Sequence, residues 1–312
     1  MGSQTFNTSG TFTGRIGVPT VDKIIGVGGG AGGGDPGAGT GGDGGGGGAL
    51  ARSINVSTVA GTPYTVTIGA GGSVNGNGGD TLFGDGSVLT AKGAIGKTGG
   101  IFGGSIGNDL VGAGLDGGAG GAGNDGGGGS NVAHAGTDGS VGVGGTGGAA
   151  EIGNPFYQID FNPAGDGATS GGPAATAGQA PGSGGGGASA LGGDAAAGAA
   201  GKMVISWTSP TPAPLYCSPS GGSNSIGTSI TIKGTPGTFS TGCTVKVDGV
   251  SATSVTVVDD ATITCTVPSG LSVGNKSVAV KNDDDVEIAV ANAFTSFASV
   301  SGGGNRRIAL GS

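Results

Sequence analysis

The sequence predicts an all-β protein: a small β base carrying packed glycine loops of polyglycine-II type, followed by a β-sandwich. Three observations carry this prediction. Residues 26–201 hold 65 of the 82 glycines, alternating apolar stretches stand on both sides of that run, and short alternating stretches follow residue 214. Glycine costs about 1 kcal/mol per position in a helix interior. We therefore expect no helix in the first two hundred residues.

Four parts follow from the composition. Residues 1–208 form a glycine-rich domain, 209–213 a Pro-rich linker, 214–298 the β-sandwich and 299–312 a C-terminal tail. The linker alternates proline with other residues, so we expect it to be stiff and extended. The tail is rich in glycine and is basic at Arg306 and Arg307, which makes it a segment that could order on a partner.

The β base is expected to begin with strands at residues 4–6 and 10–13. Phe6 and Phe12 have the same parity in these stretches and should point to one face. Residues 21–27 predict a third strand, and this strand runs directly into the glycines.

Two further alternating stretches, residues 54–58 and 64–68, flank the turn signal Thr62-Pro63. They predict a hairpin or two short neighbouring strands. The last strand of the base is expected at residues 202–207, which contain the only Trp. Strands would then bracket the glycine run at both ends.

The glycine run lacks the side chains of an ordinary core, so it is either disordered or held by its backbone. Disordered chains combine low hydrophobicity with high charge, whereas charged residues make up only 10% of this chain. Polyproline-II-type helices have three residues per turn. When such helices pack side by side, each backbone N–H and C=O can pair with a neighbour, and only glycine permits the close approach. We favour packed polyglycine-II-type helices, for which residues 117–123 (GGAGGAG) have the required spacing.

Residues 151–163 interrupt the glycines with aromatic and polar residues. One interpretation is an exposed loop that contacts a receptor or a sugar. The other is a plug that packs on the domain or on a neighbouring subunit, because aromatic side chains are more often buried. The receptor-contact candidates are Asn154, Phe156, Tyr157, Gln158, Asp160, Phe161 and Asn162.

After the linker, alternating stretches at the spacing of a β-sandwich lie at residues 230–232, 244–247, 254–258, 262–267 and 276–280. Turn signals such as Asp248-Gly249 separate them. The three cysteines, Cys217, Cys243 and Cys265, do not make a disulfide framework. One pair with one thiol left over is an alternative, and reduced, buried thiols are the prediction.

The composition argues against several classes of partner. A net charge of −8 and a pI near 4.4 argue against nucleic acid and anionic membranes. The sequence lacks an apolar run of about 18 residues, so we expect no membrane insertion. Its first residues have no basic region followed by an apolar one, so we also expect no secretory signal.

Motifs for cofactors and metals are weak. Residues 91–98 (AKGAIGKT) fit a relaxed P-loop, but glycines follow where a helix is needed. Residues 75–83 nearly fit one calcium-binding nonapeptide repeat, which works only in tandem copies. The aspartates at 283–285 are best interpreted as a solvated turn, and His134 is the only histidine. We therefore expect no enzyme activity, no cofactor and no metal site.

The first two hundred residues resemble the glycine-rich domain of bacteriophage tail-fibre and virion proteins. The matching series is QTF at 4–6, GTFT at 10–13, the strand at 23–27, YTVTIGAGG at 64–72, GNGGDTLFG at 76–84 and the closing strand at 201–207. Some members of this group are adhesins with polyglycine-II sandwiches and variable host-recognition loops. The resemblance thus implies a recognition loop at residues 150–165, although the adhesin motifs themselves are not matched residue by residue.

Residues 214–297 resemble a TIG-type (IPT/TIG) immunoglobulin-like domain. The features are CSPSGG at 217–222, SITIKG at 229–234, VKVDGV at 245–250, ATITCTVP at 261–268 and NAF at 292–294. The resemblance implies an immunoglobulin-like β-sandwich that acts as a spacer, an interaction module or a carbohydrate-contacting decoration.

Together these interpretations predict a non-enzymatic structural protein of a tailed bacteriophage virion, displayed as a tail fibre, an adhesin or a capsid decoration. Expected partners are other virion proteins, further copies of the chain and a host-surface glycan or protein. A trimer is favoured because it would hide the edges of the glycine strands. The expected location is the surface of the extracellular particle, after synthesis in the host cytoplasm. The alternative is a bacterial extracellular surface or biofilm matrix adhesin.

Overall fold

The computed structural model describes residues 2–34, 42–96, 168, 174–179, 181–189, 194–282 and 287–299. The described residues form strands and no helix, which confirms the all-β class. Among them, accordingly, no helix has the length and apolar character to cross a membrane. The chain divides into a glycine-rich unit, Gly2–Gly14 with Pro19–Thr208, and a sandwich unit, Arg15–Val18 with the residues from Ser209 onward.

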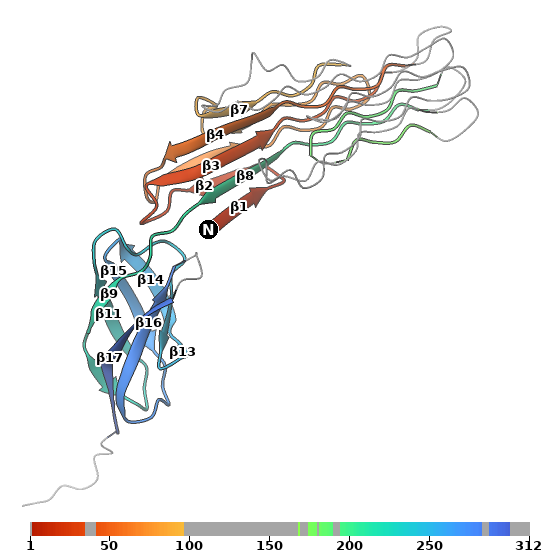
Figure 1. The fold of residues 1–312 in the computed structure, drawn as a ribbon. Coiled ribbons are helices and arrows are strands. Elements are labelled where there is room, and N and C mark those ends of the chain that lie inside the picture. Colours follow the sequence, from red (N-terminus) through yellow and green to blue (C-terminus); the bar gives the residue numbers. More distant parts are fainter. Residues whose placement is uncertain are drawn as a thin grey trace, which may run out of the picture. The chain divides into compact units, whose positions relative to one another are not determined.

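The glycine-rich unit contains two four-stranded sheets (Figure 1). The first has the order β1-β8-β3-β4, built from β1 (Gly2–Phe6), β8 (Lys202–Trp207), β3 (Thr20–Val27) and β4 (Leu50–Ser57). The second has the order β2-β5-β6-β7, built from β2 (Gly10–Thr13), β5 (Pro63–Thr67), β6 (Thr81–Phe83) and β7 (Leu89–Ala91). All pairings within both sheets are antiparallel.

Strand β3 lies inside its sheet because its sequence is apolar enough to be covered on all sides. Val21, Ile24, Ile25 and Val27 are each at most 1% exposed. β3 pairs with β4 on one side and with β8 on the other. The strands before and after the glycine run are therefore neighbours, as the bracketing predicted, and the glycine segments leave and return at one end of this sheet.

Two details of the predicted base were wrong. Phe6 and Phe12 are both buried, but they lie on β1 and β2, which belong to different sheets rather than to one face. The stretches around Thr62-Pro63 form no hairpin, because β4 pairs with β3 and β5 pairs with β2. The turn instead carries the chain from one sheet to the other.

An aromatic cluster joins the two sheets of the base. The Phe12 ring on β2 lies 6.0 Å from the Trp207 ring on β8 and 6.1 Å from the Phe83 ring on β6 (centroid distances). Tyr64 stacks on Phe83 with centroids 5.4 Å apart. Such pairs contribute packing beyond their buried area, so the base has a small conventional core from which the glycine segments extend.

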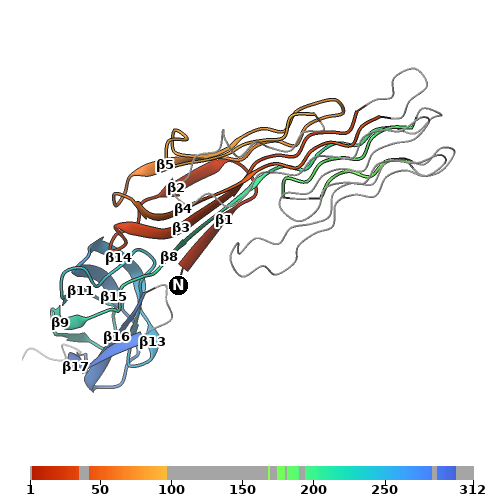
Figure 2. The same cartoon turned by 45° about the horizontal axis from the view of Figure 1, so that its top comes forward.

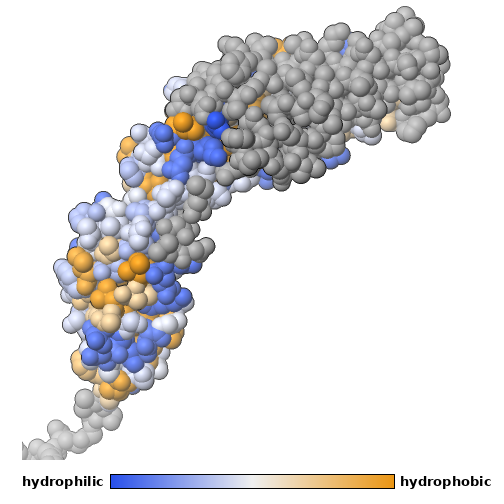
Figure 3. Space-filling model, viewed as in Figure 1, coloured by the Kyte–Doolittle hydropathy of each residue, from blue (hydrophilic) through white to orange (hydrophobic). Residues whose placement is uncertain are grey.

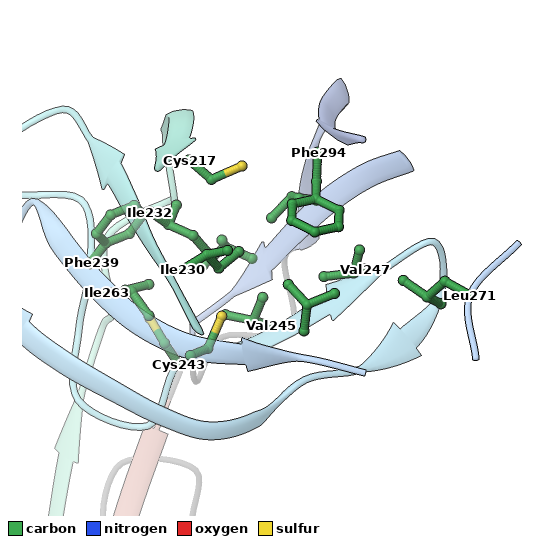
Figure 4. Close-up of a cluster of buried hydrophobic side chains, with 14 residues drawn as sticks. Cys217, Ile230, Ile232, Phe239, Cys243, Val245, Val247, Ile263, Leu271 and Phe294 are labelled. Atoms are coloured by element: carbon green, nitrogen blue, oxygen red, sulfur yellow. The ribbon is translucent and has the colours of Figure 1, made fainter. Parts of the chain in front are cut away.

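The sandwich unit consists of two sheets, with orders β14-β15-β11-β9 and β10-β17-β16-β12-β13. The strands are β9 (Pro214–Ser218), β10 (Gly221–Ser223), β11 (Thr228–Gly234), β12 (Thr244–Val247), β13 (Val250–Ser251), β14 (Thr253–Asp259), β15 (Thr262–Val267), β16 (Gly274–Lys281) and β17 (Glu287–Phe297). Figure 4 shows the core, where Ile230 and Ile232 of one sheet face Val245 and Val247 of the other around Phe294.

All five strands predicted for the sandwich are present, as β11, β12, β14, β15 and β16. The predicted turn at Asp248-Gly249 joins β12 to β13, and both residues have positive φ, 54° and 80°, as tight hairpins require. β17, the longest of the described strands, was not among the predicted ones. Alanines at 289, 291 and 293 and the polar Asn292 weaken its apolar alternation, and Asn292 (φ 55°) lies where its pairing with β16 shifts register.

The buried amide of Asn282 fastens the start of the sandwich unit to its interior. Its Oδ1 accepts hydrogen bonds from Ser240 N (3.2 Å) and Cys243 Sγ (2.6 Å). Its Nδ2 donates to Thr238 O (2.9 Å) and to Pro210 O. The residue is 1% exposed, so water cannot replace these partners.

Asn282→Ala is expected to destabilise the sandwich unit by about 3 kcal/mol, because it leaves buried backbone groups without partners. The measurement is urea unfolding followed by NMR signals of sandwich amides. Asn275→Ala is the matched control, since the Asn275 amide lies in an exposed contact with Thr295. Equal losses for the two variants would contradict this role of Asn282.

Candidate functional site

The seven predicted receptor-contact residues, 154, 156, 157, 158, 160, 161 and 162, lie outside the described residues. The same holds for His134, for the aspartates at 283–285 and for Arg306 and Arg307. The site that the structure does describe is the backbone of the glycine segments that extend from the base.

Residues 28–34 continue β3 (Figure 2) and donate their backbone N–H groups to three neighbouring segments in rotation. Donors 28, 31 and 34 reach residues 42–49, donors 29 and 32 reach 76–79, and donors 30 and 33 reach 196–199. The bonds are Gly28–Ala49 (3.0 Å), Gly29–Gly79 (2.9 Å), Gly30–Ala199 (2.9 Å), Ala31–Gly46 (2.9 Å), Gly32–Gly76 (3.0 Å), Gly33–Ala196 (2.8 Å) and Gly34–Asp43 (2.7 Å). The repeat of three is that of a chain with three residues per turn.

The carbonyl groups of the same segment accept hydrogen bonds from other directions. The donors lie in residues 70–76, 92–94 and 185–188. The bonds are Ala94 N to Gly29 O (3.0 Å), Gly72 N to Gly30 O (2.8 Å), Gly185 N to Ala31 O (3.0 Å), Asn75 N to Gly33 O (2.9 Å) and Ala188 N to Gly34 O (3.1 Å). Residues 28–34 are therefore surrounded by the backbone of other segments. Their buried N–H and C=O groups form hydrogen bonds with these segments although no β-sheet is present.

Close backbone approach explains why most of these positions are glycine. A Cβ on Gly33 would lie 1.9 Å from Gly186 O, and one on Gly32 would lie 1.9 Å from Ser73 O. By contrast, a Cβ on Gly34 would lie 3.5 Å from the nearest heavy atom. Ala31 is fully buried, so the packing admits a methyl group at some positions and excludes it at others.

Polar side chains fix the glycine segments to the base. The buried Thr81 hydroxyl donates to Val27 O (2.7 Å) and accepts from Gly69 N (2.9 Å). Asp80 binds Lys92 Nζ (2.6 Å) and Gly93 N (2.9 Å), and Asn77 Oδ1 accepts from Gly96 N (3.0 Å). The oxygens of the calcium-repeat-like stretch thus bind the chain itself, and Lys92 of the P-loop-like stretch forms an ion pair.

No group of three or more His, Cys, Asp or Glu side chains in the described part of the chain is arranged to hold a metal ion. Within the described residues of the sandwich unit, a hollow of about 340 Å³ is lined in part by Lys246, Ser251, Val255 and Lys281. Lys246 contacts Glu287 at 2.8 Å. Figure 3 shows apolar and polar residues intermixed on the visible face of this unit.

The three cysteines of the sandwich unit are buried and free, so their predicted burial is confirmed. Burial, and then the neighbouring Cys217 thiol, raises the pKa of Cys265 from 9.0 to about 11. The pKa of Cys217 is also raised, mainly by burial. These thiols are therefore poor nucleophiles at neutral pH, and they act as small core residues.

The raised pKa of Cys265 makes the sandwich unit sensitive to alkaline pH. A folded-state pKa above the unfolded value stabilises the fold below the unfolded value, and this stabilisation is lost as pH rises through the folded value. We expect the urea midpoint of the sandwich unit to be flat from neutral pH up to pH 9.0 and to fall toward about pH 11. Cys265→Ala should flatten that decline, and an unchanged slope in this variant would contradict the assignment.

Residues 216–297 match the family model described as the IPT/TIG domain. The chain therefore contains a TIG-type immunoglobulin-like domain, as the resemblance predicted. The match covers the sandwich and none of the glycine-rich unit. No curated protein matches the chain.

Proposed function

Starting from a TIG-type sandwich joined to a glycine-rich unit, we propose that this chain is a non-enzymatic structural protein of a tailed bacteriophage virion. It is displayed on the particle as a tail fibre or adhesin, or as a head decoration, and it contacts the host surface. The glycine-rich unit is a polyglycine-II-type scaffold. The observation that supports this best is the rotation of hydrogen-bond partners along residues 28–34.

A scaffold of this kind suits display outside a cell. In its glycine segments the backbone groups bind one another, so the contacts between these segments need no large side chains. Because most positions exclude a side chain, chemical variety is confined to places where the glycine pattern is interrupted. Residues 151–163 interrupt the glycines with aromatic and polar residues, which is why they remain the proposed recognition loop.

The TIG-type domain supplies a second folded module of the chain. Its core is closed by apolar side chains from both sheets, and its thiols are buried. We assign it the role of a spacer or interaction module.

Binding of the purified chain to intact bacterial cells tests the adhesin proposal. The comparison is with a variant that lacks residues 151–163. The control keeps those residues in scrambled order, which preserves length and composition. Loss of binding in both variants supports the recognition loop, whereas binding unchanged by the deletion overturns it.

A reconstruction of the particle separates the two display sites. Density for the chain on the tail, together with cell binding, supports the adhesin. Density on the head without cell binding makes the chain a decoration. Absence of the chain from the particle would overturn the virion proposal.

A further inference from the structure

The hydrogen-bond topology assigns a mechanical role: we propose that the chain bears tension between the turn at Ser73, which ends the glycine segment 69–72, and the end of β17. Load would leave the protein through Phe297 and not through β1. The biological use of this path rests on the proposed display function. The mechanical property itself follows from the directions in which paired strands are pulled.

Strand β1 is placed where tension would peel it away. Its register with β8 runs from Gly2 opposite Trp207 to Phe6 opposite Met203. Trp207 also precedes Thr208, where the chain passes for the last time from the glycine-rich unit to the sandwich unit. A force that separates Gly2 from Trp207 therefore acts at one end of the β1–β8 pairing. The backbone pairs open one after another, so at any moment a single pair resists the force.

The glycine segments meet tension in the opposite way. Residues 69–72 bond to the segment that leads into β8, through Gly198 N to Gly72 O (2.9 Å) and Gly201 N to Gly69 O (2.8 Å). Gly72 N also donates to Gly30 O (2.8 Å). A pull on the exposed Ser73, at the turn that ends this segment, acts along these chains. The bonds share the load and must fail together.

In the sandwich unit, too, tension acts along paired strands. β10 pairs with β17 in parallel, with Gly221 opposite Thr295 and Ser223 opposite Phe297. The bonds Thr295 N to Ser220 O and Asn224 N to Phe297 O, both 2.8 Å, hold the pair. Because an early strand runs parallel to the last one, tension that enters before β9 and leaves after β17 shears this pair.

The residues that lead into β9 are held by hydrogen bonds of their own. The Asn282 amide donates to Pro210 O ahead of β9, and β9 pairs along its length with β11. A pull on the linker is therefore resisted before it reaches the parallel pair. The two units thus share one property: each is strong when it is pulled along its strands.

Single-molecule force spectroscopy of the full chain tests this inference. One molecule carries Ser73→Cys and is held at that thiol and after β17; the other is held ahead of β1 and after β17. The native thiols are buried, so the new cysteine reacts selectively. We expect the glycine-rich unit to open at a force about threefold higher in the first geometry, since forced opening follows the unfolding barrier and several backbone pairs break together.

Equal opening forces in the two geometries would overturn the inference. So would a sandwich unit that opens before β1 is released in the second geometry. These outcomes are independent of the proposed function, because no host or particle is involved in the measurement. Conversely, a failure to bind cells would leave the order of the opening forces unchanged.

Discussion

Gly33→Ala is expected to destabilise the glycine-rich unit by about 3 kcal/mol, because a new methyl group must displace packed backbone. The Cβ would lie 1.9 Å from Gly186 O and 2.5 Å from the carbonyl carbon. A carbonyl in this position is held by its own chain and cannot rotate away like a side chain. Urea unfolding followed by the fluorescence of Trp207, the only Trp and 3% exposed, reports on this unit.

Gly34→Ala is the matched control in the same segment. Its Cβ would meet Asp43 N at 3.5 Å, an ordinary contact. We expect its stability to change by less than about 1 kcal/mol, with a slight gain from the lower entropy of the unfolded chain. Amide exchange of residues 28–34 should rise in Gly33→Ala and stay slow in Gly34→Ala. Equal losses in both variants would show that close backbone packing does not select glycine here.

Phe12→Ala is expected to cost about 4 kcal/mol, since it removes a buried aromatic ring and leaves a cavity. Phe12 is 1% exposed and contacts aromatic rings of both sheets of the base, including Trp207 at 6.0 Å. Loss of this ring should loosen the sheets and the glycine segments that start from them. Thermal melting followed by circular dichroism measures the change.

Val59→Ala controls for a general effect of removing apolar atoms from the base. Its side chain is 66% exposed, and surface changes of this kind usually stay within about 0.5 kcal/mol. If Phe12→Ala melts like this control, the aromatic cluster is not what holds the two sheets together.

The strands were predictable wherever side chains alternate between a covered and an open face. Residues 21–27 and 202–207 are examples, because a pleated chain imposes a period of two on its sequence. Pairing was not predictable in the same way. β5 pairs with β2, some fifty residues earlier, and local alternation contains no information on which distant strand supplies the partner.

The candidate site was predictable only in part. Residues 151–163 stand out by composition alone, while the backbone contacts of residues 28–34 leave no pattern of side chains from which to read their neighbours. The side chains of Thr81, Asp80 and Asn77 bind the glycine segments, but the sequence placed these residues only in a calcium-repeat-like stretch. Their actual partners are chain atoms up to 54 residues away.

The sequence by itself determined that the glycine tracts, if ordered, had to be held by their backbone, because so many of their positions carry no side chain and so few carry charge. It also determined the TIG-type sandwich, whose alternating apolar residues specify two facing sheets. Only the tertiary structure decided which glycine segments are neighbours and which glycines exclude a methyl group. The reason is physical: backbone hydrogen bonds are alike at every residue, so the choice among partners depends on where the sheets of the base place the chain, and not on the residues themselves.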